Sequence, residues 1–429
     1  MRKSIRFNFC SIIIFVNLMF MQTDIFFPNH NITNIWYRVF NCIRYAMAAG
    51  LVFFTWTQRN KINFNSKIKS YLFMLLIPFA LFFVAEMIAA IQSPVVREFG
   101  IRYWTRDATY FFDKISVVIL VICSWLLLDK KTLEMATITL LINNATILFV
   151  TIFEEGIIET LKIFPIVLGL AKENAATKIM EIHELTYCLG LLLIYYLFFK
   201  KNKSKKDNLY ISLLSLFFML GGKRIAFFGL IVCGLFAYIV SKKNLSKIGL
   251  ITIGIFGFFI SFGYVYIVYN NKFIEIMDLL RINTMGRDII YRYFVRRTTF
   301  ATDYLGWGLS GVAKVIENMD PKEAINMVNV RGLHNDLLKM YINLGFIGFT
   351  AWLIINLIIF PLFINEKLGK CRATLYLCIT AFAFITYLTD NTENYSIFQF
   401  ILFLVPIAGD IEYELVDVDD NSYTMNENF

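Results

Sequence analysis

The chain has 429 residues, of which 58% are hydrophobic, 17% aromatic and only 17% charged. A water-soluble fold of this length could not bury so much apolar surface in one core, and a disordered chain would be richer in charge and poorer in aromatic residues. The composition therefore excludes both classes and predicts an all-α polytopic membrane protein. The net charge of +9 does not indicate a nucleic-acid partner, because Lys and Arg lie in short loops between apolar runs.

Twelve apolar runs approach or reach the length of about 20 residues that a membrane-spanning helix needs. These runs cover residues 9–27, 35–57, 70–92, 111–128, 132–152, 183–199, 208–222, 225–241, 247–269, 341–365, 373–389 and 395–410. The predicted organisation is nine spans within residues 1–269, a long loop over 270–340, three spans within 341–410 and an acidic tail over 411–429.

The orientation follows from the charges in the short loops. When the loops are assigned to alternate sides, one side carries more than twice as many Lys and Arg residues as the other. Short basic loops stay in the cytoplasm, so both termini are expected there. The loop over 270–340 then lies outside, which for a bacterial inner membrane is the periplasm. Loops of this length are usually functional or disordered, and its aromatic and helical pattern favours function.

Three histidines, His30, His183 and His334, map to the outer side. Their spacing matches no zinc motif, so we expect neither a metal nor another cofactor. His334 differs from the others because it lies where the long loop meets the tenth span. We expect it in the first turn of that helix, whose positive end favours a neutral ring that can act as a base. Along the same helix, Gly345 and Gly348 predict a small-residue surface for close helix packing.

Two groups of cations are predicted to bind an anion. The periodicity of residues 286–297 predicts a helix with Arg287 and Arg297 on its apolar face, where an unpaired cation is expensive. Lys223 and Arg224 mark the outer ends of the seventh and eighth spans. The guanidinium fork of arginine suits bidentate contact with phosphate oxygens. The alternative for Lys223 and Arg224 is that they anchor the helix ends at the membrane surface.

Four polar residues are candidates to support His334. Asn335 and Asp336 follow it directly, and Asp390 lies in a tight polar turn between the eleventh and twelfth spans. Asp390 is a candidate to orient the imidazole ring. Glu86 lies well inside the third span, where an ionisable group indicates function by default, although it could instead pair with an arginine.

Taken together, these features resemble the bacterial superfamily of O-antigen polymerases (Wzy-type) and O-antigen ligases (WaaL-type), which also serves capsule and exopolysaccharide systems. The resemblance lies in the many spans, the long late outer loop and three motifs. The motifs are GRD at 286–288, GWGLSG at 306–311 and HNDLLKMYINLGFIG at 334–348. The resemblance covers the topology of the whole chain, while the specific motifs lie within residues 221–348.

The resemblance implies a fold similar to the GT-C class and a metal-independent, inverting glycosyltransferase. Its donor would be a glycan on undecaprenyl pyrophosphate at the periplasmic face of the inner membrane. Arg224 and Arg287 match the family arginines that contact the pyrophosphate, and His334 matches the family histidine. One departure is Lys223-Arg224, where the family motif often reads Ser-Arg.

Three functions remain open at this point, and we favour the first. A polymerase would join the growing glycan to a new lipid-linked repeat unit, whereas a ligase would transfer it to the lipid A core. A flippase for lipid-linked oligosaccharides would place charges along a cavity through many spans, but these spans are nearly uncharged. The expected partners are the undecaprenyl-pyrophosphate-linked oligosaccharide, membrane lipids, a chain-length regulator and a flippase.

Overall fold

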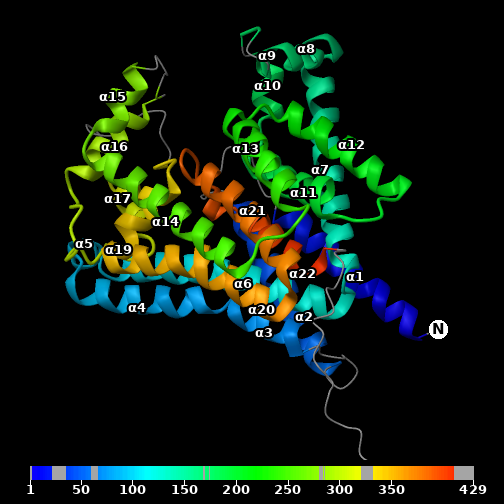
Figure 1. The fold of residues 1–429 in the computed structure, drawn as a ribbon, viewed down its shortest axis with the longest axis horizontal. Coiled ribbons are helices and arrows are strands. Elements are labelled where there is room, and N and C mark those ends of the chain that lie inside the picture. The colour runs from blue at the N-terminus through cyan, green and yellow to red at the C-terminus, as the bar shows by residue number, and fades with distance from the viewer. Residues whose placement is uncertain are drawn as a thin grey trace, which may run out of the picture.

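The computed structural model describes residues 2–21, 35–58, 66–167, 170–172, 174–279, 284, 286–319 and 332–409. Over these ranges the chain forms helices joined by turns and loops, and it contains no strand (Figure 1). The predicted all-α class is therefore confirmed for the described part of the chain.

Helices coincide with all twelve predicted apolar runs, although some runs contain more than one helical segment. The first seven runs correspond to α1 (Arg2–Phe20), α2 (Ile35–Thr57), α3 (Ser66–Met74) with α4 (Ile77–Gln92), α6 (Ile101–Leu128), α7 (Lys131–Glu155), α11 (His183–Ile194) with the π-helix η3 (Tyr195–Phe199), and α12 (Lys205–Leu220). The last five correspond to α13 (Arg224–Val240), α14 (Lys247–Tyr269), α19 (Asp336–Ile354) with the π-helix η4 (Ile355–Ile359) and α20 (Phe360–Leu368), α21 (Lys370–Tyr387), and α22 (Ser396–Ala408).

Within the described ranges, six helical stretches are long and apolar enough to cross a membrane. They are Val39–Thr57, Lys67–Gln92, Asp107–Leu128, Lys131–Glu155, Lys247–Tyr269 and Asp336–Leu368. Four shorter apolar helices accompany them, namely Phe9–Phe20, Glu184–Phe199, Arg224–Val240 and Ser396–Ala408. Length and composition thus support a membrane protein, while twelve crossings, the GT-C class and the orientation stay predictions.

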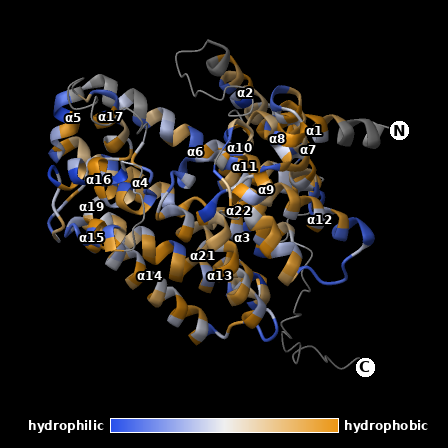
Figure 2. Cartoon of the chain, turned by 90° about the horizontal axis from the view of Figure 1, so that it is seen from above, coloured by the Kyte–Doolittle hydropathy of each residue, from blue (hydrophilic) through white to orange (hydrophobic). Residues whose placement is uncertain are grey.

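Many large apolar side chains of these helices are exposed, and Figure 2 shows that hydrophobic residues predominate in α13 and α14. Phe149 and Phe153 of α7, Ile239 of α13, and Phe256 and Phe259 of α14 are between 66% and 84% exposed. Exposed apolar surface on this scale is not found on a water-soluble monomer. It is the surface expected of helices that face lipid.

Several boundaries differ from the predicted ones, among them the start of α6, which begins at Ile101 and not at 111. The third predicted span is divided into α3 and α4, because Pro78 in the first turn of α4 has no backbone N–H to continue the preceding helix. The tenth helix begins at Asp336 and not at 341, so it already includes part of the predicted loop. Residues 22–27 of the first predicted span and the acidic tail over 411–429 lie outside the described residues.

The predicted loop over 270–340 contains three short helices in its described part. They are α15 (Lys272–Leu279), α16 (Arg287–Val295) and α17 (Gly311–Glu317). In Figure 1 these helices lie with α5 (Pro94–Phe99) at one end of the molecule, opposite the end that carries the N-terminus. Three more short helices, α8 (Ile157–Leu161), α9 (Ile163–Val167) and α10 (Ala175–Met180), follow α7. The 3₁₀-helix η5 (Thr392–Asn394) lies between α21 and α22.

Candidate functional site

The sequence predicted that His334 lies in the first turn of α19. In the structure it lies immediately before this helix. Asn335 is the N-cap of this helix, and its side-chain Oδ1 accepts a hydrogen bond from the backbone N of Leu338 at 2.9 Å. His334 has a φ of 48°, in the left-handed region that residues other than glycine rarely adopt. Its backbone N donates to Oδ1 of Asn391 at 3.1 Å, which helps to hold this conformation.

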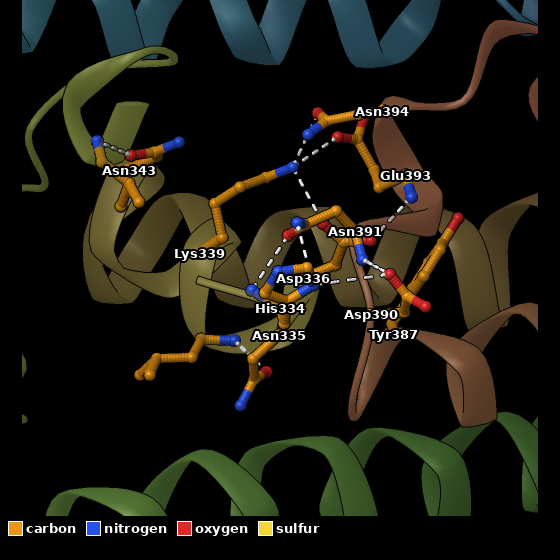
Figure 3. Close-up of polar contacts among 12 residues, drawn as sticks. His334, Asn335, Asp336, Lys339, Asn343, Tyr387, Asp390, Asn391, Glu393 and Asn394 are labelled. Carbon is orange, nitrogen blue, oxygen red and sulfur yellow. Dashed lines mark hydrogen bonds and ion pairs between the residues drawn. The ribbon is translucent and has the colours of Figure 1, made fainter. Parts of the chain in front are cut away.

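The imidazole ring of His334 faces the turn between α21 and α22 (Figure 3). Its Nδ1 lies 3.7 Å from Oδ1 of Asp390 and 3.4 Å from Nδ2 of Asn391. The side chain of His334 is 29% exposed, whereas that of Asp390 is only 4% exposed. The structure therefore brings together the two residues that the sequence proposed as base and orienting carboxylate, and it leaves the ring accessible from outside.

Arg287 approaches the same group of residues from α16. Its positive charge acts on the hydroxyls of both Tyr187 and Tyr291. The hydroxyl of Tyr291 donates to the backbone O of His334 at 3.2 Å, and that of Tyr187 donates to Oδ2 of Asp390 at 2.7 Å. Burial raises the pKa of Tyr291 to about 12, although the charge of Arg287 opposes this rise. Tyr291 is thus a neutral hydroxyl that donates to the His334 segment.

Asn335, a predicted support residue, has a structural role in addition to capping α19. It is completely buried, and its Nδ2 donates to the hydroxyl of Tyr264 at 3.0 Å. That hydroxyl in turn donates to the backbone O of Leu388 at 2.7 Å. Asn335 therefore connects the start of α19 to α14 and to the end of α21.

The other predicted phosphate ligands have different surroundings. Lys223 pairs with Glu181, with 2.7 Å between Nζ and Oε1. The charge of Glu181 also acts on the hydroxyl of Tyr187, the residue that donates to Asp390. Arg224 is the first residue of α13 and is exposed.

The predicted position of Arg297 on the apolar face of a helix is wrong. The helix α16 ends at Val295, so the helical periodicity does not extend to Arg297. Its side chain is exposed and stacks on Tyr293, with the guanidinium carbon 3.6 Å from the ring centroid. Arg297 thus lies on the surface beyond the end of α16, and its contact with a phosphate stays a prediction.

Glu86 and Asp107 hold the GWGLSG segment against the helical bundle. A carboxylate oxygen of Glu86 accepts a hydrogen bond from the backbone N of Leu309, and Oδ1 of Asp107 accepts one from the backbone N of Ser310 at 2.9 Å. Asn343 of α19 donates from Nδ2 to the backbone O of Leu309 at 2.6 Å. Glu86 thus anchors a loop, a role that the sequence had not assigned to it.

Gly345 and Gly306 allow two backbone segments to cross. Gly345 interrupts α19 with φ 72° and ψ −178°, and the backbone N of Phe346 donates to the backbone O of Tyr304 at 2.8 Å. A Cβ atom on Gly306 would lie 2.5 Å from the backbone N of Gly345. The predicted helix–helix surface is therefore wrong at Gly345, which contacts a loop. A Cβ atom on Gly348 would meet only Leu344 of its own helix.

A buried cluster of four charges lies beside His334, and we call it the charge cluster; Figure 3 shows three of its members, Asp336, Lys339 and Glu393. Nζ of Lys339 lies 2.8 Å from Oδ1 of Asp336 and 3.0 Å from Oε2 of Glu393, and Nζ of Lys114 lies 2.6 Å from Oε1 of Glu393. The sequence identified Asp336 but missed Lys114 and Lys339. Lys114 lies within the predicted span over 111–128, where ionisable groups are rare, so its position was an available signal. Lys339 lies in the predicted loop over 270–340, where a lysine is ordinary.

A largely apolar cavity borders the charge cluster. Its volume is about 50 Å³, and it lies between α4, α6, α19, α21 and α22. Phe79, Phe82 and Phe384 line its walls, and Lys114 and Glu393 also face it. The charge cluster thus separates the turn that contacts His334 from an apolar space within the bundle.

No family model matches this sequence, and no curated protein is significantly similar to it. In the part of the chain that the structure describes, no three His, Cys, Asp or Glu side chains are grouped as a metal site would require.

Proposed function

We propose that this protein is an O-antigen or capsular polysaccharide polymerase of the bacterial inner membrane. It transfers a growing glycan from undecaprenyl pyrophosphate onto a new lipid-linked repeat unit at the periplasmic face. The observation that carries this proposal is the approach of His334 to Asp390 within a bundle of apolar helices, together with the charge of Arg287, which acts on the two tyrosines that donate to Asp390 and to the backbone of His334. A base and a phosphate ligand at the end of a membrane bundle suit a reaction between two lipid-linked substrates.

In the proposed reaction, His334 accepts the proton of the acceptor hydroxyl. Its Nδ1 faces Asp390 and Asn391, so Nε2 is the nitrogen that meets the substrate. The acceptor oxygen attacks the anomeric carbon from the side opposite the pyrophosphate. A glycosidic C–O bond forms, the bond to the phosphate oxygen breaks, and the configuration inverts. The carboxylate of Asp390 stabilises the imidazolium that results.

Arg287 has the proposed role of holding the pyrophosphate as it leaves. The leaving group gains negative charge in the transition state, and a fixed guanidinium nearby stabilises that charge. Lys223 and Arg224 are proposed as further ligands on the α13 side of the site. The proposed active site uses no metal and no cofactor, because the arginines supply the positive charge that the leaving group needs.

The polysaccharide of a deletion strain tests the proposal. The gene is deleted, and surface polysaccharide is separated on a gel after complementation with the wild-type gene or with His334→Gln. We expect the deletion strain and His334→Gln to make only one-repeat chains, and the wild-type gene to restore the ladder. Accumulation of polymer that is not attached to lipid A would instead indicate a ligase, and loss of outward transport would indicate a flippase.

A purified-enzyme assay then assigns the role of His334. The rate of His334→Gln should fall about 10²–10⁴-fold, because the amide retains hydrogen bonding but cannot act as a base. Binding of the lipid-linked donor should be unchanged. A rate for His334→Gln close to that of the wild type would make His334 a positioning contact, and the base would then be sought at Asp390.

A further inference from the structure

Two chain segments that are distant in sequence form the His334 site, and their mutual position needs an explanation. One is the start of α19, residues 334–339, and the other is the turn over 390–395. The direct contacts of the His334 ring with this turn are long, at 3.4 Å to Asn391 and 3.7 Å to Asp390. Contacts of this length hold a ring weakly.

The charge cluster joins the same two segments with much shorter contacts. The backbone N of Glu393 donates to Oδ2 of Asp336 at 2.6 Å, and Nζ of Lys339 donates to Oδ1 of Asn394 at 2.9 Å. From α6, the hydroxyl of Tyr110 donates to Oε2 of Glu393 at 2.7 Å. Three elements therefore meet at Glu393, and the cluster fixes the 390–395 turn against α19.

The charges of the cluster balance within it. Asp336 and Glu393 supply two negative charges, Lys114 and Lys339 two positive ones, and their side chains are at most 11% exposed. Each charge contacts an opposite one, so neither lysine has an uncompensated charge to offer a phosphate. A buried charge becomes costly when its partner is removed, so the geometry of such a cluster is strictly defined.

We propose that Lys339 is a positioning residue that sets the orientation of His334 by locking the 390–395 turn onto the start of α19. Lys339 acts through Glu393 and Asn394, which belong to the same turn as Asp390 and Asn391. This inference rests on the proposed function for its activity readout, but the geometry of His334 can be measured independently.

The test compares Lys339→Met with the double variant Asp336→Asn/Lys339→Met. The single variant leaves the two carboxylates facing Lys114 alone. The double variant removes one charge of each sign and keeps the Lys114–Glu393 pair, and the new amide oxygen can still accept from the backbone N of Glu393. Lys272→Met is the matched control, because Lys272 forms an exposed pair with Glu275.

Two readouts are taken on the full-length protein in detergent. The first is transfer activity, and the second is the rate at which diethylpyrocarbonate modifies His334, measured by peptide mass spectrometry. We expect Lys339→Met to lower transfer about 100-fold, as small displacements of reacting groups do, and to raise the modification rate severalfold. The double variant should return both the transfer activity and the modification rate of His334 much of the way to their wild-type values. Lys272→Met should match the wild type in both measurements.

Each other outcome has a definite meaning. If the modification rate of His334 is unchanged in Lys339→Met, the proposal is overturned. If transfer is in addition lost in both Lys339→Met and the double variant, Lys339 contacts substrate. If the wild type shows no transfer but Lys339→Met still changes the modification rate, the proposed function fails and the positioning role stands. Should Lys339→Met not accumulate, Asp336→Asn alone also unbalances the cluster and should produce the same changes.

Discussion

At the residue scale, the helix α16 contains both the candidate phosphate ligand, Arg287, and a control residue of the same type, Arg292. Arg287 at the start of α16 acts electrostatically on Tyr187 and Tyr291, whereas Arg292 on the same helix is exposed. We predict that Arg287→Ala abolishes polymer without lowering protein abundance. Arg287→Lys should retain little activity, because an ammonium cannot replace the bidentate fork. Polysaccharide gels of complemented deletion strains measure the polymer, and immunoblots of the same strains measure protein abundance.

Arg292→Ala is the matched control for Arg287→Ala, with the same substitution one turn further along α16. It should leave the ladder intact. Near-normal chains from Arg287→Ala would show that Arg287 does not contact the pyrophosphate, and equal losses from both variants would indicate damage to α16 as a whole.

Glu393 should make the stability of the protein depend on pH at the acidic end. Burial would raise the pKa of Glu393, but the positive charges of Lys114 and Lys339 outweigh it and lower the pKa to about 2. The folded protein therefore prefers the carboxylate. Its contribution to stability is complete above the ordinary value of 4.5 and is lost as the pH falls toward 2.

We predict that Glu393→Gln lowers the free energy of unfolding by about 3 kcal/mol at neutral pH, because two buried lysines lose part of their compensation. The difference from the wild type should narrow as the pH falls from about 5 to about 2, because the unfolded wild-type chain binds a proton in this range that the folded protein does not. Thermal unfolding in detergent measures both effects, with the exposed Glu275→Gln as control. A difference that is independent of pH would mean that Glu393 is not ionised in the fold.

At the scale of elements, the crossing of Gly306 and Gly345 joins the outer loop to α19. Gly306 has a φ of 87°, and a Cβ atom there would lie 2.5 Å from the backbone N of Gly345. Gly306→Ala should therefore destabilise the protein by at least about 2 kcal/mol, through backbone strain and overpacking. Gly263→Ala in α14 is the control, since no atom lies within 4 Å of its added Cβ. Equal thermal unfolding of both variants would contradict the crossing.

Most of the long helices could be predicted, because a long run of apolar residues directly indicates a helix that faces lipid. The run over 247–269 coincides with α14 from end to end. The break at Gly345 could not be predicted, because it arises from a contact with a loop about 40 residues earlier in the chain, between Phe346 and Tyr304. Local periodicity carries no information about such a contact.

The candidate site was predictable only in part, for the same reason. His334 and Asp390 stand out as polar residues at the ends of apolar runs, and the structure brings them together, whereas Arg287 stands out through the helical periodicity of residues 286–297. Lys339 does not stand out in the sequence, because its partner Glu393 lies 54 positions away and the pairing depends on how α19 and the 390–395 turn meet. Residues that act through another segment need the fold before they can be recognised.

At the scale of the whole molecule, the orientation decides whether His334 can meet a periplasmic substrate. The helices α11 and η3 run from His183 to Phe199, close to the lower limit of about 17 residues for a membrane span. If they cross, the exposed residues Ala171 and Ser204 lie on opposite sides of the membrane. If they do not, both residues lie on the same side and the alternation of the basic loops fails.

We predict that single cysteines alternate in their access to a membrane-impermeant maleimide. In a cysteine-free background, Ala171→Cys and Thr302→Cys should react in cells whose outer membrane is permeabilised, and Ser204→Cys only after the inner membrane is opened. Thr302 is exposed in the segment between α16 and α17, on the side where the proposed substrate is found. If Ala171→Cys and Ser204→Cys react from the same side, α11 and η3 do not cross the membrane. If Thr302→Cys reacts only after the inner membrane is opened, His334 lies in the cytoplasm, where no translocated glycan could reach it.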